Sequence, residues 1–217
     1  GKLYRALCLN DARIFETRFP GDQSRVSVDL LLDASTSQEE RTETVARQAY
    51  ILAESLSALK LPVRVWGYLS MSGYTVLTRY RDYEEHDKNE EIFRYFTAGA
   101  NRDGLAYRAV GELMAAHPAE RKILIVLSDV TPNDMVKFLY QGQEQAYAGE
   151  AAIENAAKEV RAVSAEGTTT LCVYTGDEAG VPAVQRVFGQ NFVKINSLNR
   201  FAAAAGRLLE LALSSPA

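Results

Sequence analysis

The stretch that decides the fold reads Val26-Ser27-Val28-Asp29-Leu30-Leu31-Leu32, followed directly by Asp33-Ala34-Ser35-Thr36-Ser37. Its first part is β-branched and leucine-rich, which is typical of a buried strand. Its second part carries a carboxylate and two hydroxyls at every second position. The segment from Gln38 to Leu59 has apolar residues at helical spacing. A strand, a polar loop and a helix open an α/β unit, and such sheets bind ligands at the carboxyl ends of their strands.

The same alternation continues along the chain. It predicts strands at 26–32, 63–69, 74–80, 122–127, 171–174 and 192–195, of which the third returns antiparallel to the second. Helices are expected at 103–116, 150–166, 180–188 and 198–213, with a short helical piece at 92–96 and a long connection at 130–149. The predicted fold is therefore a doubly wound α/β fold with a mostly parallel six-stranded sheet and one antiparallel edge strand.

Length and composition limit the classes of function. The 217 residues are 47% hydrophobic and 24% charged, which suits one domain at residues 25–217 with an N-terminal extension at 1–24. The chain begins Gly-Lys, which we interpret as the start of a domain cut from a longer protein. The net charge of −4 gives no basic footprint for nucleic acid or for an anionic membrane. No apolar run reaches the length of about 20 residues that a membrane span needs.

The two cysteines, Cys8 and Cys172, are too few for a disulfide framework. Cys172 lies in a predicted buried strand, where a reduced thiol is expected. We therefore expect a cytoplasmic location.

Three loops carry the candidate chemistry. The first holds Asp33, Ser35 and Ser37, the second reads Gly99-Ala100-Asn101-Arg102-Asp103-Gly104, and the third is Ser128-Asp129 after the most apolar strand. In a doubly wound sheet such loops converge on one edge. Oxygen donors without His or Cys suit Mg²⁺, Mn²⁺ or Ca²⁺ rather than Zn²⁺. The alternative is that these side chains only cap the helices that follow them.

These residues resemble the metal-ion-dependent adhesion site of von Willebrand factor A (VWA) domains. The finer resemblance is to the C-terminal domains of the nitric oxide reductase activation protein and the cobalt chelatase large subunit. It rests on residues 101–106, Asn-Arg-Asp-Gly-Leu-Ala, and on residues 118–134, Pro-Ala-Glu-Arg-Lys-Ile-Leu-Ile-Val-Leu-Ser-Asp-Val-Thr-Pro-Asn-Asp. The resemblance covers roughly residues 26–213, the size of one such domain.

The resemblance implies a set of metal ligands. Ser35 and Ser37 would be direct ligands, and Asp33 and Asp129 would hold the ion directly or through water. The usual second-loop ligand is Thr, and Asn101 falls at its place, with Asp103 as a rival for the same role. A second departure is Val130, where the family usually has Gly, and we expect it to narrow the open face of the site. Arg102 is a candidate for a partner's carboxylate, with an ordinary surface arginine as the alternative.

Enzyme classes have less support. Ser35 or Ser37 as a nucleophile would need a base, and the chain offers only His86 and His117. Asp33 as a phosphoryl acceptor lacks an evident lysine after a later strand. No glycine-rich nucleotide-binding motif is present.

The resemblance implies a metal-dependent protein-interaction domain rather than an enzyme. Its partner would offer a Glu or Asp to the metal and would be an AAA+ ATPase, and the pair would activate a metalloenzyme such as nitric oxide reductase or insert its metal. The alternatives are a cobalt chelatase component in cobalamin biosynthesis and a structural scaffold without a metal.

Overall fold

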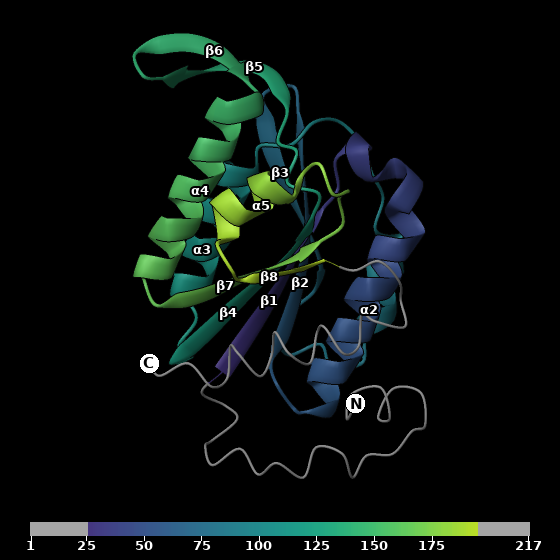
Figure 1. Ribbon diagram of the computed structural model, residues 1–217. Coiled ribbons are helices and arrows are strands. Elements are labelled where there is room, and N and C mark those ends of the chain that lie inside the picture. The colour runs from purple at the N-terminus through teal and green to yellow at the C-terminus, as the bar shows by residue number, and fades with distance from the viewer. Residues whose placement is uncertain (1–25, 195–217) are drawn as a thin grey trace.

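A computed structural model of the chain describes residues 26–194. The centre is a six-stranded sheet in the order β3-β2-β1-β4-β7-β8 (Figure 1). Its strands are β1 (Val26–Asp33), β2 (Val63–Met71), β3 (Tyr74–Arg81), β4 (Arg121–Ser128), β7 (Thr168–Tyr174) and β8 (Phe192–Lys194). Each neighbouring pair is parallel except β2 and β3, which are antiparallel. The predicted fold class, including the antiparallel edge strand, is confirmed.

Helices cover both faces of the sheet. They are the α-helices α2 (Thr42–Ala58), α3 (Asp103–Ala115), α4 (Gly149–Ala165) and α5 (Val181–Phe188), and the 3₁₀ helices η3 (Thr36–Arg41) and η4 (Asn89–Arg94). Alternate residues of β1 enter opposite cores because successive strand side chains point to opposite faces. Leu30 and Leu32 share a core with α2 and η4. Leu31 shares the other core with α3, α4 and α5.

Some predictions lie outside the described residues. These are the helix at 198–213, the boundary between residues 24 and 25, and Cys8. Cys172 is a buried free thiol, as predicted. Within residues 26–194, no helix has both the length and the apolar character needed to cross a bilayer.

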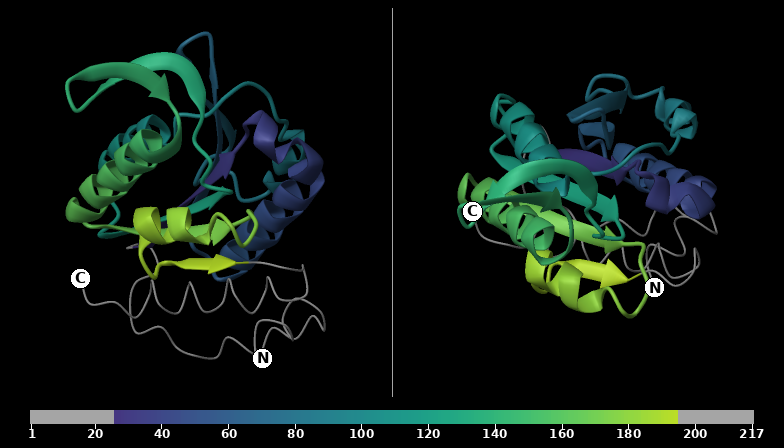
Figure 2. Two further views of the ribbon diagram at one scale, coloured as in Figure 1. Left: turned by 45° about the horizontal axis from the view of Figure 1, so that its top comes forward. Right: turned by 90° about the horizontal axis from the view of Figure 1, so that it is seen from above.

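The predicted connection at 130–149 is wrong, because it contains an antiparallel hairpin of β5 (Asp134–Tyr140) and β6 (Gln143–Tyr147). Its two-residue turn is Gln141-Gly142, and both residues have positive φ, as tight hairpin turns require. Phe138 packs edge-on against Tyr147, which is itself buried. The hairpin projects beyond the body of the domain at the carboxyl edge of the sheet (Figure 2).

Two isolated bridges attach the second loop to its neighbours. Ser70, near the end of β2, pairs with Ala100, and Asn101 pairs with Asn133, just before β5. The second loop is therefore held between the central sheet and the base of the hairpin, beside the ends of β1 and β4.

Candidate metal centre

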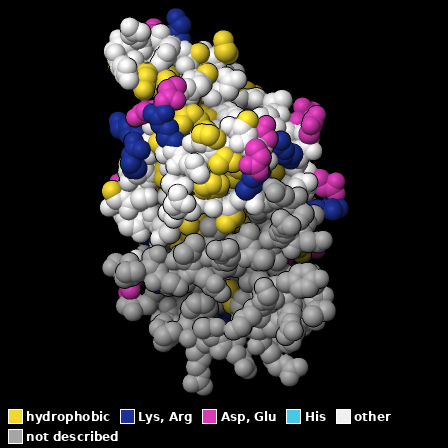
Figure 3. Space-filling view, viewed as in Figure 1, with side chains coloured by type: hydrophobic (Ala, Val, Ile, Leu, Met, Phe, Trp, Pro, Cys, Tyr) yellow, Lys and Arg dark blue, Asp and Glu magenta, His cyan; other side chains and the backbone are white. Residues whose placement is uncertain are grey.

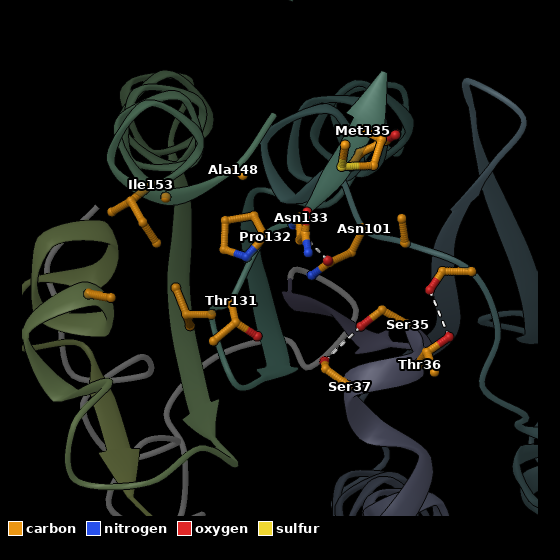
Figure 4. Close-up of a pocket in the computed structure, with 16 residues that line it drawn as sticks. Ser35, Thr36, Ser37, Asn101, Thr131, Pro132, Asn133, Met135, Ala148 and Ile153 are labelled. Carbon is orange, nitrogen blue, oxygen red and sulfur yellow. Dashed lines mark hydrogen bonds between the residues drawn. The ribbon is translucent and has the colours of Figure 1, made fainter. Parts of the chain in front are cut away.

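The first loop places two hydroxyls side by side. Ser35 Oγ and Ser37 Oγ lie 3.0 Å apart and face the cleft in Figure 4. Ser35 is the N-cap residue of η3, yet its side chain makes no capping hydrogen bond. The capping alternative for Ser35 is therefore wrong. Ser35 is buried and Ser37 is exposed, so the pair spans the floor and the mouth of the site.

Asp33 lies beneath these hydroxyls at the end of β1 and is completely buried. Its Oδ1 accepts a hydrogen bond from Ser35 N at 3.0 Å. Its Oδ2 accepts one from Ser128 Oγ at 2.8 Å and a longer one from Asn101 Nδ2 at 3.4 Å. One carboxylate therefore joins the three predicted loops.

The third loop supplies Asp129 close by. Its Oδ1 accepts hydrogen bonds from the Thr131 backbone N–H and hydroxyl, at 3.1 and 2.5 Å. Its Oδ2 lies 3.8 Å from Arg41 Nη1. Sequence reasoning missed both Arg41 and Thr131. The Arg41 contact depends on how two loops fold together, whereas Thr131 is two residues from Asp129, and an Asp side chain that accepts the N–H two residues on is a common local turn.

Asn101 is brought into the cluster but presents its nitrogen to it. Nδ2 donates to Asp33 and, at 2.9 Å, to Asp103 Oδ1. Oδ1 accepts from the backbone N–H of Asn133 at 3.0 Å, and only an oxygen can do so, which fixes the orientation of the amide. An oxygen ligand at this position would require the amide to turn over and lose the Asn133 hydrogen bond.

Asp103 lies deeper, at the first residue of α3. It is fully buried, and its carboxylate accepts hydrogen bonds from Tyr68 Oη at 3.0 Å and Tyr107 Oη at 3.4 Å. These contacts indicate a residue that supports Asn101 and the loop rather than one that faces the cleft. Asp103 stays a predicted metal ligand, but its carboxylate oxygens already accept hydrogen bonds from Tyr68, Tyr107 and Asn101, and a metal ion would compete with these donors.

The electrostatics of the cluster favour a cation. Burial, and then the nearby Asp129 carboxylate, raise the pKa of Asp33 to about 6. Burial and Asp33 together raise the pKa of Asp103 well above its ordinary value. Closely spaced buried carboxylates repel each other, and a positive charge among them would relieve that repulsion. The hydroxyls of Ser35 and Ser37 add the neutral oxygens that Mg²⁺ accepts.

A cleft of about 570 Å³ opens above this cluster. Its lining includes Ser35, Ser37, Asn101, Thr131 and Met135, all labelled in Figure 4. The other side of the cleft comes from residues at the starts of α4 and α5, among them Gly149, Ile153 and Ala183. Within the described part of the chain, no group of three or more His, Cys, Asp or Glu side chains is placed to hold a metal. The cluster instead combines hydroxyls, carboxylates and an amide.

Val130 is among the residues that line the cleft and has a positive φ of 52°. Its backbone N–H donates to Ser128 Oγ at 2.9 Å, and its side chain is buried. A β-branched residue in this conformation is a genuine outlier, because its side chain crowds the backbone. The backbone after Asp129 is therefore strained.

Arg102 is not available to a partner's carboxylate, which corrects that prediction. Its Nε donates to Asp134 Oδ2 at 2.8 Å, and its Nη2 donates to the Val136 carbonyl oxygen. The guanidinium also lies over the ring of Tyr147. Arg102 therefore fastens the second loop to the base of the hairpin.

The two histidines lie far from the first loop. His117 follows α3 at the amino edge of the sheet, where its ring packs 4.3 Å from that of Tyr83. His86 follows β3, the antiparallel strand, which ends at that same edge. Neither histidine is placed to deprotonate Ser35 or Ser37, so the arrangement offers no nucleophilic triad.

The sequence has little similarity to known proteins. No family model matches the chain. The uncharacterized protein PA0525 of Pseudomonas aeruginosa is 25% identical over 161 residues, which are 69% of this chain and 25% of that protein. The chain thus spans about a quarter of the length of this relative.

Two solved structures resemble the domain in fold. The vWF domain of the type V pili tip protein Mfa5 from Porphyromonas gingivalis has a TM-score of 0.65 at 12% identity, over 91% of this chain and 99% of that one. The PilB minor pilin from Streptococcus sanguinis has a TM-score of 0.62 at 13% identity, over 90% and 64%. The domain therefore has a VWA-like fold.

Proposed function

We propose that this domain binds a divalent cation, Mg²⁺, at the cleft and uses it to hold a carboxylate of a protein partner. The observation that carries the proposal is that the paired Ser35 and Ser37 hydroxyls line an open cleft beside the buried Asp33 carboxylate, which accepts a hydrogen bond from the Ser35 backbone N–H. A bound ion would supply the positive charge to which an incoming Glu or Asp is attracted.

The residues would have separate roles. Ser35 and Ser37 would provide neutral ligands, and Asp33 and Asp129 would provide the negative charge, directly or through water. Ser128 orients Asp33, and Thr131 orients Asp129. Asn101 donates to Asp33 in the present arrangement and would join the ligands only after its amide turns over. Mn²⁺ and Ca²⁺ suit the same oxygen donors.

The finer proposal concerns the partner. The resemblance of residues 101–106 and 118–134 supports an AAA+ ATPase, which would work with this domain to activate or metallate a metalloenzyme such as nitric oxide reductase. The domain itself would be a non-enzymatic adaptor in the cytoplasm. A cobalt chelatase component is the second candidate because the same segments resemble that family, and an acidic, His-rich segment elsewhere in the full protein would favour it.

Calorimetric titration with Mg²⁺ and Mn²⁺ tests the cation. We expect saturable binding by the wild type, and at least tenfold weaker binding by Asp33→Ala and Ser35→Ala. Ser27→Ala is the matched control, because Ser27 is a buried serine at the other end of β1. If the wild type binds neither ion at millimolar concentration, the metal-binding proposal is wrong and the domain is a structural scaffold without a metal.

A further inference from the structure

The base of the β5–β6 hairpin is irregular, and the second loop holds it. The pairing register of the two strands shifts between Asp134 and Lys137, which marks a β-bulge. Asp134 pairs with Arg102 through Oδ2 and accepts the Val136 N–H on Oδ1 at 2.8 Å. Bulges beside binding sites commonly redirect a side chain. Here the ion pair is mostly buried, so the bulge is fixed to the loop that carries Asn101.

The bulge presents apolar side chains to solvent beside the cleft. Met135 is 81% exposed and also lines the cleft, and Leu139, further along β5, is 70% exposed. Large apolar side chains that gather on a surface commonly mark a site of interaction.

The turn between β2 and β3 extends the same surface. Tyr74 is 75% exposed, and a methyl group added at Gly73 would lie 3.7 Å from Val136 Cγ2, so the two hairpins adjoin. We call this surface the apolar ridge. It consists of Met71, Tyr74, Val76, Met135, Val136 and Leu139, each at least 42% exposed. Figure 3 shows apolar side chains on the hairpin at the top of the molecule, with a basic side chain beside them.

We propose that the apolar ridge docks the same partner segment whose carboxylate enters the cleft. The partner motif is then an acidic residue flanked by large apolar side chains, an inference that rests on the proposed function. Met135 belongs to both the cleft and the ridge, so a segment anchored by its carboxylate continues directly onto the ridge. Exposed Lys137 lies between Met135 and Leu139 in sequence and offers a positive charge to the acidic residue of the segment. Exposed Glu144, which pairs with Leu139 across the hairpin, disfavours a second acidic residue there and leaves that end of the ridge to an apolar side chain.

Random twelve-residue peptides displayed on phage provide a defined probe. The full 217-residue chain is used for selection in Mg²⁺, and bound phage are eluted with chelator. Selected peptides are then titrated by fluorescence anisotropy against the wild type and the Met135→Ser/Leu139→Ser double variant. Leu113→Ser is the control, because Leu113 is 41% exposed on α3, outside the ridge. Tyr74→Ser is a second ridge variant, and it changes the β2–β3 hairpin instead of the β5–β6 hairpin.

The expected result is a set of Mg²⁺-dependent peptides with Asp or Glu beside Leu, Phe, Tyr or Met. These peptides should bind the double variant at least tenfold more weakly and the Leu113→Ser variant unchanged, because burial of large apolar groups contributes affinity on that scale.

The other outcomes separate the two proposals. Mg²⁺-dependent acidic peptides with no apolar preference, bound equally by the double variant, overturn the ridge and leave the cleft intact. Selection that yields no Mg²⁺-dependent acidic peptide overturns both. A wild type that sediments as a dimer, and a double variant that sediments as a monomer, would assign the ridge to a second copy of this chain and overturn the inference.

Discussion

The Ser128 hydroxyl donates a hydrogen bond of 2.8 Å to Asp33 Oδ2, joining the ends of β4 and β1 across 95 positions of sequence. The same hydroxyl oxygen accepts the backbone N–H of Val130. A single buried serine therefore sets both the orientation of the central carboxylate and the path of the third loop.

Ser128→Ala should destabilise the domain by about 1–3 kcal/mol, because it leaves Asp33 Oδ2 and the Val130 N–H without this buried partner. Urea unfolding measures the change. Ser55→Ala is the matched control, since the Ser55 hydroxyl donates only to the Ile51 carbonyl of its own helix. Equal stability of the two variants would show that the Ser128 bridge contributes nothing.

Val130→Gly should be more stable than Val130→Ala, by about 1 kcal/mol, because any side chain at a φ of 52° crowds the backbone and glycine does not. Thermal or urea unfolding compares the two variants. At Val126, in the middle of β4, the order should reverse, because glycine weakens a strand interior. If the alanine variant is the more stable one at Val130 as it is at Val126, the backbone at Val130 is not strained.

The stability of the metal-free domain should depend on Asp33. Its pKa is about 6 in the folded state against an ordinary value of 3.8. A carboxyl whose pKa is raised by folding stabilises the fold below its unfolded pKa, and this stability is lost as pH rises through the folded pKa. Unfolding in chelator should therefore show a loss of stability between pH 4 and pH 6 that Asp33→Asn lacks. Parallel pH profiles for the two proteins would show that burial does not raise this pKa.

Arg102→Met should loosen the hairpin, because it removes the ion pair with Asp134 and the donor to the Val136 carbonyl. Hydrogen exchange should become faster in residues 134–147 than in the central strands. Arg108→Met, which breaks an ion pair between α3 and α4, should leave the hairpin unaffected. If hydrogen exchange in residues 134–147 is unchanged in Arg102→Met, Arg102 does not hold the hairpin in place.

The fold and the edge that carries the site were predictable from local signals. The apolar run of β1 and the polar residues after β1 and β4 follow directly from strand and loop chemistry, and parallel strands bring their ends together. The hairpin was missed because Gln143-Glu144-Gln145 lacks apolar alternation and the bulge interrupts the period of β5. The Gln141-Gly142 pair was the available turn signal.

The orientation of Asn101 and the role of Arg102 were beyond prediction from sequence. Both depend on contacts with the segment from Asn133 to Val136, more than 30 positions away. Spacing within the second loop identified a polar cluster there, but it carried no information on which atom of the amide faces Asp33.

The most direct test of the proposed metal centre is a crystal structure of the domain grown with Mn²⁺ and recorded at a wavelength where manganese scatters anomalously. We predict one strong anomalous peak in the cleft, within ligand distance of Ser35 Oγ and Ser37 Oγ and beside Asp33 and Asp129. A cleft without that peak, at Mn²⁺ concentrations that saturate the protein in calorimetry, would contradict this prediction.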